Sequence, residues 1–302
     1  MENTLKRINE LKKEKDAVIL AHYYTDGQIQ ALADYVGDSY YLSKIAKEIP
    51  QKNILVCGVS FMGESAKILN PTKTVILADK HAKCPMAHMA DIEKIKEVRK
   101  KYSDVAVVCY VNSTAEIKAY SDVCVTSSNA VKIVKALPNH NIYFIPDANL
   151  GRYIAEMIPD KNFILNDGFC YVHTGIKSSD VEKAKELHPD ALVLAHPECT
   201  FDVLQMADYV GSTSGIIDFA TKSAKKSFII CTENGVLYEL KLKNPHKEFY
   251  LASHNQVCHD MKRITVEGVL EQLENMSNVV EPDEEIYSKA STSLEKMLEL
   301  AK

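Results

Sequence analysis

The sequence lacks the long apolar run and the excess of basic residues that would direct a protein to a membrane or to nucleic acid. No stretch reaches the roughly 18–20 apolar residues that span a bilayer. The opening segment MENTLKRINELKKEK is charged and helical in character, unlike a secretory signal, so we expect a cytoplasmic protein. The 36 Lys and Arg against 41 Asp and Glu give a net charge of −5, whereas non-specific nucleic-acid binding needs a basic surface.

Motifs of several common enzyme classes are also missing. No G-x-G-x-x-G follows an apolar run and no G-x-x-x-x-G-K-[ST] occurs, so the sequence gives no support for a nucleotide cofactor. The G-x-S-x-G nucleophile elbow is absent. His196-Pro197-Glu198 has the H-x-E pattern of zinc deaminases but not their P-C-x-x-C partner. Without any C-x-x-C pair, zinc-ribbon and thioredoxin-type sites are disfavoured as well.

What stands out is eight cysteines in an otherwise ordinary globular composition, with 46% hydrophobic and 25% charged residues, 11 Gly and 10 Pro. Disulfides are disfavoured in the cytoplasm, so these thiols are core residues, metal ligands or nucleophiles. Four of them lie inside apolar runs, and we expect those four to be buried core thiols: Cys57, Cys109, Cys124 and Cys231.

Short β-branched apolar runs alternate with amphipathic helical patterns along the whole chain. This alternation is typical of α/β proteins, in which helices cover both faces of parallel sheets. The expected strands are 17–22, 53–58, 73–79, 105–111, 141–147, 162–167, 191–196, 227–232 and 248–253. The expected helices include 29–48, 62–70, 115–120 and 180–188.

The chain also contains three copies of one unit of about 87 residues. Each copy runs strand, turn, helix, Pro-x-Lys, strand, loop and cysteine, and ends at Cys84, Cys170 or Cys258. Length alone suggests two domains of typical size. The repeat instead predicts three αβα units, which are residues 1–84 with 259–302, residues 85–170 and residues 171–258. The two C-terminal helices, placed after the third cysteine, would pack back on the first unit.

Three such units around a pseudo-threefold axis would direct equivalent strand-end loops into one central cavity, because parallel sheets carry functional groups at the carboxyl ends of their strands. The repeat therefore selects four sets of equivalent residues. They are the three terminal cysteines; His22, Tyr110 and His196; Tyr24, Asn112 and Glu198; and Ser39, Ser127 and Thr213.

Each set has a chemical interpretation and a plainer alternative. Three converging thiolates suit a soft metal centre, and a [4Fe–4S] cluster held by three cysteines leaves one iron open to a substrate oxygen. Histidine and glutamate suit acid–base work, tyrosine and asparagine suit oxyanion binding, and hydroxyls at helix starts suit anion binding. The alternatives are core cysteines inherited from one ancestral repeat, satisfied structural histidines and ordinary helix N-caps.

Over nearly its whole length the chain resembles the quinolinate synthases, iron–sulfur enzymes of de novo NAD biosynthesis. The resemblance is carried by ILAHYY, ADYVGDS, FMGESAKILNP, AKCPMA, YVNSTAE, VTSSNAV, PDANLGRY, GFCYVH, LAHPEC, DYVGSTSG, TENGVLY and VCHDMK. It implies three αβα domains around a central site. It also implies one [4Fe–4S] cluster on Cys84, Cys170 and Cys258, with one iron open to substrate or water.

The resemblance further implies a condensation of iminosuccinate (iminoaspartate) with dihydroxyacetone phosphate, which gives quinolinate, phosphate and two waters. Tyr24, His173 and Glu198 match family positions for proton transfer. The matching substrate-binding positions are His22, Ser39, Tyr110, Val111, Asn112, Ser127, His196, Pro197, Glu198 and Thr213. A functional link to an iminosuccinate-producing aspartate oxidase or dehydrogenase is expected, and no nucleic-acid or membrane partner.

Two other functions use the same cysteines. A non-catalytic iron–sulfur sensor would need a surface for a partner or for nucleic acid, and the sequence shows neither a basic patch nor a separate reader domain. A hydro-lyase with an open-iron cluster is the other alternative, and the triple repeat together with the HPEC and YVNS motifs disfavours it.

Overall fold

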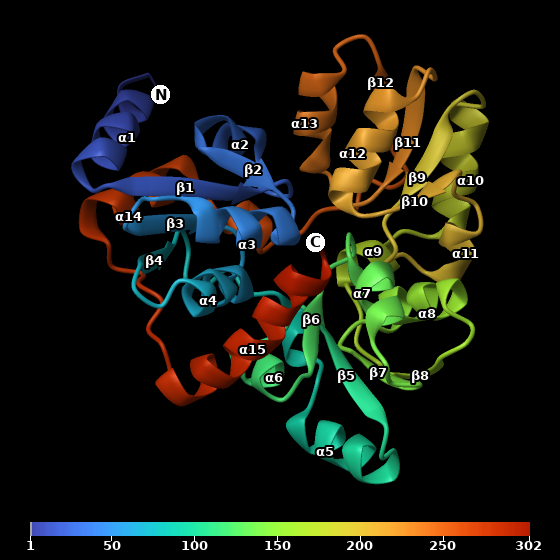
Figure 1. The fold of residues 1–302 in the computed structure, drawn as a ribbon. Helices are drawn as coiled ribbons and strands as arrows, with labels where there is room; N and C mark the ends of the chain where they lie inside the picture. Colours follow the sequence, from blue (N-terminus) through green and yellow to red (C-terminus); the bar gives the residue numbers. More distant parts are fainter. Residues whose placement is uncertain (1) are drawn as a thin grey trace.

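The structure, a computed structural model, describes residues 2–302, which form three lobes around a common centre (Figure 1). Each lobe contains one parallel four-stranded sheet. In spatial order the sheets are β2 (Tyr35–Gly37), β1 (Ala17–His22), β3 (Asn53–Cys57) and β4 (Thr74–Leu77); β6 (Val123–Val125), β5 (Val105–Tyr110), β7 (Asn141–Ile145) and β8 (Asn162–Leu165); and β10 (Tyr209–Val210), β9 (Leu192–Ala195), β11 (Ser227–Cys231) and β12 (Glu248–Leu251). The strand order is the same in all three sheets, which confirms the predicted α/β fold of three similar units.

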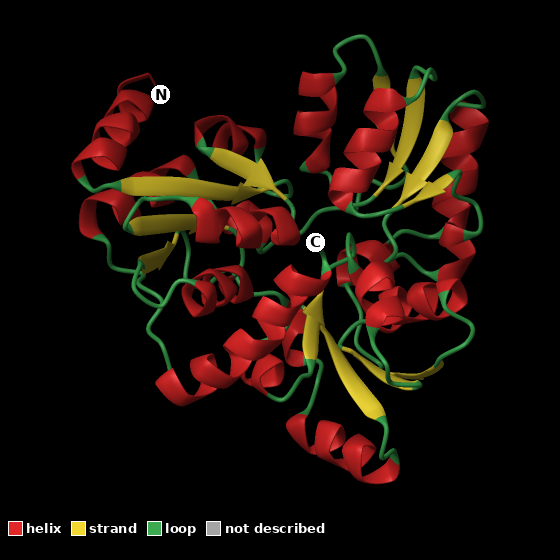
Figure 2. Cartoon of the chain, in the orientation of Figure 1, coloured by secondary structure: helices red, strands yellow, loops and turns green. Residues whose placement is uncertain are grey.

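Helices flank the strands in every lobe (Figure 2). They are α1 (Glu2–Glu14), α2 (Gly27–Leu32), α3 (Ser39–Glu48), α4 (Ser60–Leu69), α5 (Ile92–Lys101), α6 (Ala115–Ala119), α7 (Ala130–Ala136), α8 (Ala148–Met157), α9 (Tyr171–Gly175), α10 (Ser178–Leu187), α11 (Phe201–Leu204), α12 (Thr213–Lys222), α13 (Val236–Lys243), α14 (Val266–Asn275) and α15 (Glu284–Leu300). Short 3₁₀ turns lie at Pro85–His88 and Met261–Arg263.

All nine expected strands are present, but the expectation of one helix over 29–48 is wrong. That segment forms α2, then strand β2, then α3. Asp34 causes the break: its backbone N–H donates to Ile19 O at 2.9 Å, and its carboxylate accepts from Ile19 N at 2.8 Å. The short edge strands β2, β6 and β10 were not predicted, since two or three residues are too few to show a strand pattern.

Two elements that recur in the three units support the backbone. One is an aspartate at an equivalent position in each unit, which accepts a hydrogen bond from a backbone N–H of the neighbouring strand, in the pairs Asp34–Ile19, Asp122–Val107 and Asp208–Val193. The lysines of the Pro-x-Lys elements, Lys73, Lys161 and Lys247, donate to backbone carbonyls at or just beyond the C-terminal ends of α3, α7 and α12. Because those carbonyls have no partner inside the helix, the lysines complete the helix ends.

Of the two C-terminal helices, which the sequence placed on the first unit, α14 packs there and α15 does so only in part. Helix α14 packs on α1 and β3 of the first lobe, whereas α15 packs mainly on α6 and β6 of the second lobe and also touches α4 of the first. One continuous apolar core accordingly spans the first and second lobes, while the third lobe has two separate core clusters. The residue boundaries assigned to the three units stay a prediction.

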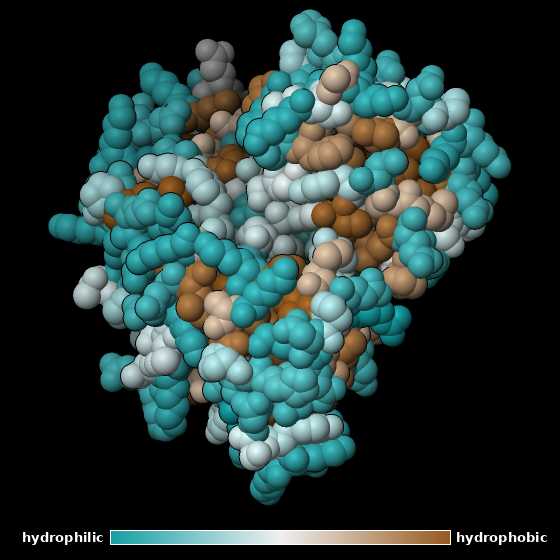
Figure 3. Space-filling view, turned by 45° about the vertical axis from the view of Figure 1, so that its right-hand side comes forward, coloured by the Kyte–Doolittle hydropathy of each residue, from teal (hydrophilic) through white to brown (hydrophobic). Residues whose placement is uncertain are grey.

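The described chain buries its non-equivalent thiols. Cys57, Cys109, Cys124 and Cys231 are fully buried, as predicted, and so is Cys199. The face shown in Figure 3 is mostly hydrophilic, with smaller hydrophobic areas between. None of the helices within residues 2–302 is both long enough and apolar enough to cross a membrane.

Candidate active site

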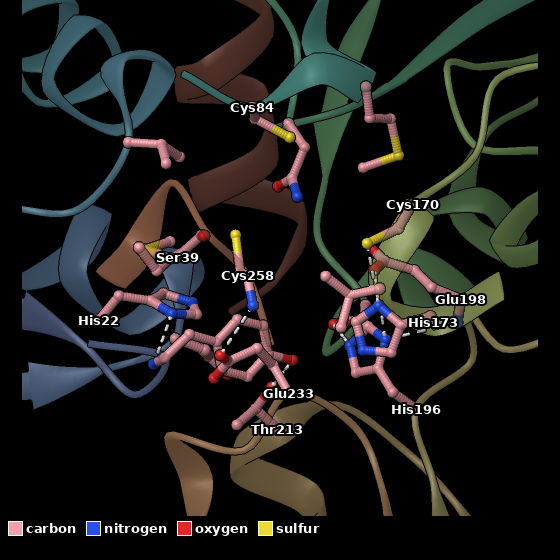
Figure 4. Close-up of a pocket in the computed structure, with 18 of the residues that line it drawn as sticks. His22, Ser39, Cys84, Cys170, His173, His196, Glu198, Thr213, Glu233 and Cys258 are labelled. Carbon is pink, nitrogen blue, oxygen red and sulfur yellow. Dashed lines mark hydrogen bonds and ion pairs between the residues drawn. The ribbon is translucent and has the colours of Figure 1, made fainter. Parts of the chain in front are cut away.

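A cavity lies at the centre of the three lobes, where loops from all three sheets meet (Figure 4). It brings together side chains that are far apart in the sequence. The expected residues that line it are His22, Tyr24, Ser39, Cys84, Tyr110, Asn112, Ser127, Cys170, His173, His196, Glu198, Thr213 and Cys258. The convergence that the repeat predicted is therefore present in the fold, although it does not by itself assign a role to any residue.

Val111 and Pro197 are the two expected residues whose side chains do not line this cavity. Val111 is buried, and its backbone N–H donates to Val125 O at 2.9 Å. Successive side chains along an extended strand point to opposite faces, so Tyr110 and Asn112 can face the cavity while Val111 turns to the core. The binding role that the resemblance implied for these two residues stays a prediction.

The three cysteine loops are anchored in the same way. In each lobe, the backbone carbonyl of the residue two positions before the cysteine accepts a hydrogen bond of 2.8 Å. The donor is the backbone N–H of a residue just after β3, β7 or β11. The donor and acceptor pairs are Ser60–Ala82, Ala148–Gly168 and Asn234–Gln256. Figure 4 shows the thiols of Cys84, Cys170 and Cys258 facing the same cavity.

These thiols fit a soft metal group by their chemistry. All eight cysteines are free, so none of the three is tied up in a disulfide. Burial, with a smaller contribution from nearby Cys258, raises the pKa of Cys84 to about 12, and burial raises the pKa of Cys170 and Cys258 as well. Three thiols that are protonated without metal would release protons on ligation. Asn112 Oδ1 is also buried in this cavity and has no hydrogen-bond partner among residues 2–302, as expected where a further group binds.

His22 and His196 are buried, neutral histidines of defined tautomer. Burial lowers the pKa of each to about 3. Nδ1 of His22 accepts from Tyr24 N at 3.1 Å, and Nδ1 of His196 accepts from Glu198 N at 3.4 Å. A neutral imidazole that accepts at Nδ1 carries its proton on Nε2. His196 Nε2–H accordingly donates to Ser127 Oγ at 3.2 Å.

Glu198 is a buried carboxylate paired with His173. Its Oε2 lies 2.6 Å from His173 Nδ1, and that nitrogen is also 3.2 Å from Cys170 Sγ. Burial works to raise the pKa of Glu198, but the attraction and hydrogen bond of His173 outweigh it and hold the pKa at about 2. Glu198 Oε1 is buried with no hydrogen-bond partner in the described protein. Ligand atoms of Cys170, His173 and Glu198 lie within 4.8 Å of one another.

Tyr24 and Tyr110 are phenols that stay protonated. Burial raises the pKa of both well above the usual value, and the nearby Glu198 carboxylate raises it further. Tyr24 Oη is 2.8 Å from Thr213 Oγ1 and 2.8 Å from Thr232 Oγ1. Each phenol can donate a hydrogen bond but is a poor base at neutral pH.

Two helices begin at the cavity, although the expected hydroxyls are not their N-caps. Ser39 and Thr213 are the first residues of α3 and α12, and the N-cap residues are their predecessors Asp38 and Ser212. Ser127 lies in a turn shortly before α7. The backbone N–H groups of both helix starts leave a positive end close to the cavity, which favours anions there.

Sequence reasoning missed Thr232, Glu233 and Lys262. Glu233 is fully buried and lines the cavity; its carboxylate accepts from Cys258 N at 3.0 Å and pairs with Lys262 Nζ at 3.1 Å. Lys262 also donates to Tyr24 O at 2.8 Å, so it joins the first lobe to the third. The sequence offered one signal for Thr232 and Glu233, which is their position. They directly follow β11, just as Pro146 and Asp147 directly follow the equivalent strand β7.

Comparison with known proteins matches this arrangement to one family. The profile of that family, described as quinolinate synthetase A protein, matches residues 6–299. The chain belongs to the quinolinate synthetase A family. A quinolinate synthase of Fusobacterium nucleatum is 54% identical over 295 residues, covering 98% of both chains. Those of Clostridioides difficile and Caldicellulosiruptor bescii are 51% and 52% identical, each over at least 97% of both chains.

Membership of the quinolinate synthetase A family confirms the resemblance found in the motifs. The shared length means that all three lobes, and not one module, are common to this chain and its relatives. An iron–sulfur group belongs to this family, and three cysteine thiols of this chain face the cavity.

Proposed function

We propose that the chain is a quinolinate synthase of NAD biosynthesis that condenses iminosuccinate with dihydroxyacetone phosphate and releases phosphate and two waters. The observation that carries the proposal is the single cavity in which three equivalent cysteines meet acid–base and anion-binding residues from all three lobes. Full-length identity of about half to named quinolinate synthases supports the same reaction. The soluble substrates fit a cytoplasmic enzyme, which we also propose, together with a link to an enzyme that produces iminosuccinate from aspartate.

In this proposal Cys84, Cys170 and Cys258 hold one [4Fe–4S] cluster. When bound, such a cluster supplies a Lewis-acidic iron without a protein ligand, which favours the loss of a poor oxygen leaving group. Glu233 positions the third ligand through its hydrogen bond to Cys258 N.

The anionic groups of the substrates would be bound by neutral donors and helix ends. His22 and His196 carry their protons on Nε2, and Tyr110 adds a phenol that stays protonated. The starts of α3 and α12 supply backbone N–H groups beside Ser39 and Thr213. Two carboxylates and one phosphate can thus be held without placing buried lysine or arginine charges against the cluster.

Proton transfer would use Glu198 and Tyr24 in opposite roles. Glu198 is ionised at neutral pH, and its unpartnered Oε1 can accept a proton from a carbon next to an imine or carbonyl. Tyr24 stays protonated and can donate to a developing oxyanion or leaving oxygen. His173 orients Glu198 through its 2.6 Å contact.

The test is anaerobic purification followed by iron and sulfide analysis and an assay for quinolinate with both substrates. Cys84→Ser, Cys170→Ser and Cys258→Ser should each lose the cluster and the activity. Cys199→Ser is the matched control, because this thiol is buried in the core of the third lobe and should leave both unchanged. Wild-type protein that carries the cluster but forms no quinolinate would overturn the proposal.

A further inference from the structure

Asp38 and Ser214 join the starts of two helices that belong to different lobes. Asp38 is the N-cap residue of α3 in the first lobe, and Ser214 lies in the first turn of α12 in the third lobe. Asp38 Oδ2 accepts a hydrogen bond from the hydroxyl of Ser214. The contact lies beside the cavity, because the chain neighbours Ser39 and Thr213 both line it (Figure 4).

Neither helix needs this contact to complete its own N-terminus. The other carboxylate oxygen of Asp38, Oδ1, accepts from Tyr41 N at 2.9 Å and caps α3. Ser212 Oγ accepts from Gly215 N at 3.1 Å and caps α12. The hydrogen bond between Asp38 and Ser214 is additional to both caps, so what it fixes is the position of one helix start relative to the other.

Counting protons gives the direction of each bond around this contact. A carboxylate oxygen only accepts, so the hydroxyl of Ser214 donates to Asp38. Ser214 has no second proton, so in its 3.2 Å contact with Ser212 Oγ the donor is Ser212. Gly215 N–H in turn donates to Ser212. The backbone of α12 is thus connected to the Asp38 carboxylate by three consecutive hydrogen bonds, all directed toward the first lobe.

Comparison of the three units shows what distinguishes this contact. Equivalent positions are occupied by Asp38, Thr126 and Ser212. The counterpart of Ser214 in the second lobe is Ser128. Thr126 Oγ1 and Ser128 Oγ lie 2.8 Å apart, so they repeat the contact of Ser212 with Ser214 inside a single lobe. In the first lobe the equivalent residue is an aspartate, and its second oxygen reaches the third lobe.

We propose that Asp38 and Ser214 are positioning residues, whose contact sets the spacing between the helix starts at Ser39 and Thr213. The inference rests on the proposed function for its consequence, because those helix starts are where the anionic groups of the substrates would be held. The contact also gives each oxygen of the Asp38 carboxylate a donor, which reduces its repulsion of a bound anion. Without the hydroxyl of Ser214, the two helix starts are free to separate and the carboxylate is free to turn.

The test compares Ser214→Ala, which removes the hydroxyl, with Ser214→Thr, which keeps it. The matched control is Ser128→Ala, which removes the equivalent hydroxyl from the second lobe. Each protein is purified anaerobically with its cluster loaded, and its iron content is determined.

The helix starts would hold anionic groups equally in the ground state and the transition state, so the effect should fall on binding. Ser214→Ala should raise the KM for dihydroxyacetone phosphate or the Kd for quinolinate by about tenfold, depending on which anion spans the two starts, with kcat changed by less than about threefold. Ser214→Thr and Ser128→Ala should each stay within about threefold of the wild type in all three constants.

A second readout does not depend on the reaction. In crystal structures of the cluster-loaded proteins, the backbone nitrogens of Ser39 and Thr213 should lie farther apart in Ser214→Ala than in the wild type, and at the wild-type distance in Ser214→Thr. If the wild-type protein forms no quinolinate, the proposed function fails, while this distance still decides whether the contact sets the spacing.

Four results would each overturn the inference. They are wild-type KM and Kd in Ser214→Ala, equal changes in Ser214→Thr or Ser128→Ala, a loss confined to kcat, and an unchanged distance between the two helix starts. If the alanine variant does not fold, Ser214→Gly takes its place.

Discussion

Two buried histidines should make the folded protein sensitive to mild acid. Burial lowers the pKa of His22 and His196 to about 3, whereas in the unfolded chain they titrate near 6.5. The unfolded chain therefore binds protons that the folded chain cannot. The contribution of these residues to stability is complete above pH 6.5 and is lost progressively as the pH falls toward 3.

The size of the effect follows from the two pKa values. At pH 5, each histidine is about 1.5 pH units below its unfolded pKa, which corresponds to about 2 kcal/mol of folding free energy. His22→Gln should therefore reduce the loss of unfolding free energy between pH 7 and pH 5 by about 2 kcal/mol. Glu198 does not interfere, because its pKa of about 2 when folded and 4.5 in its ordinary state both lie below this window.

The assay is urea unfolding followed by far-ultraviolet circular dichroism at pH 7, 6 and 5, since the chain has no tryptophan. His246→Gln is the matched control, because His246 is exposed between α13 and β12. It should leave the pH dependence unchanged. The reasoning is refuted if His22→Gln loses stability with acid as steeply as the wild type, or if the control flattens the dependence equally.

Three further predictions address the cavity and its supports. Glu198→Gln should keep iron and sulfide but slow quinolinate formation by about 100-fold or more, since an amide cannot accept the proton; an unchanged anaerobic rate would remove Glu198 from the mechanism. Lys262→Met leaves the buried Glu233 carboxylate without its cation and should destabilise the protein by about 3 kcal/mol in thermal melts, whereas no loss would show that the pair is dispensable. Lys247→Met removes three hydrogen bonds near the end of α12 and should cost about 1–2 kcal/mol at unchanged iron content; lost iron would give this lysine a role at the site.

Most of the fold could be read from local patterns. The nine main strands are continuous apolar runs because both faces of each sheet are covered, and burial on both faces leaves a strong signal in the sequence. The edge strands are different, since β2, β6 and β10 depend on backbone pairing with a neighbouring strand rather than on their own composition. For the same reason the pattern over 29–48 predicts one helix, although the pairing of Asp34 with Ile19 divides that segment.

The repeat also identified most of the cavity. Equivalent positions in three similar units are related by the fold, so spacing alone brought together Cys84, Cys170 and Cys258 and the strand-end residues around them. Spacing could not distinguish cavity residues from architectural ones, and the repeated lysines prove to complete helix ends. Spacing also could not show that Ser39 and Thr213 are the first residues of their helices and that the N-caps are the residues before them.

The amino-acid sequence by itself thus determined the α/β class, the threefold repeat and the three cysteines that face the cavity, because each depends on periodicity or spacing along the chain. The family followed from the resemblance carried by its motifs. Only the tertiary structure decided the protonation and partners of the buried groups. The 2.6 Å contact of His173 with Glu198, the hydrogen bond between Thr232 and Tyr24 and the Lys262–Glu233 pair each join segments far apart in the sequence. Burial and neighbouring charges set their chemistry, and neither is encoded at any single position.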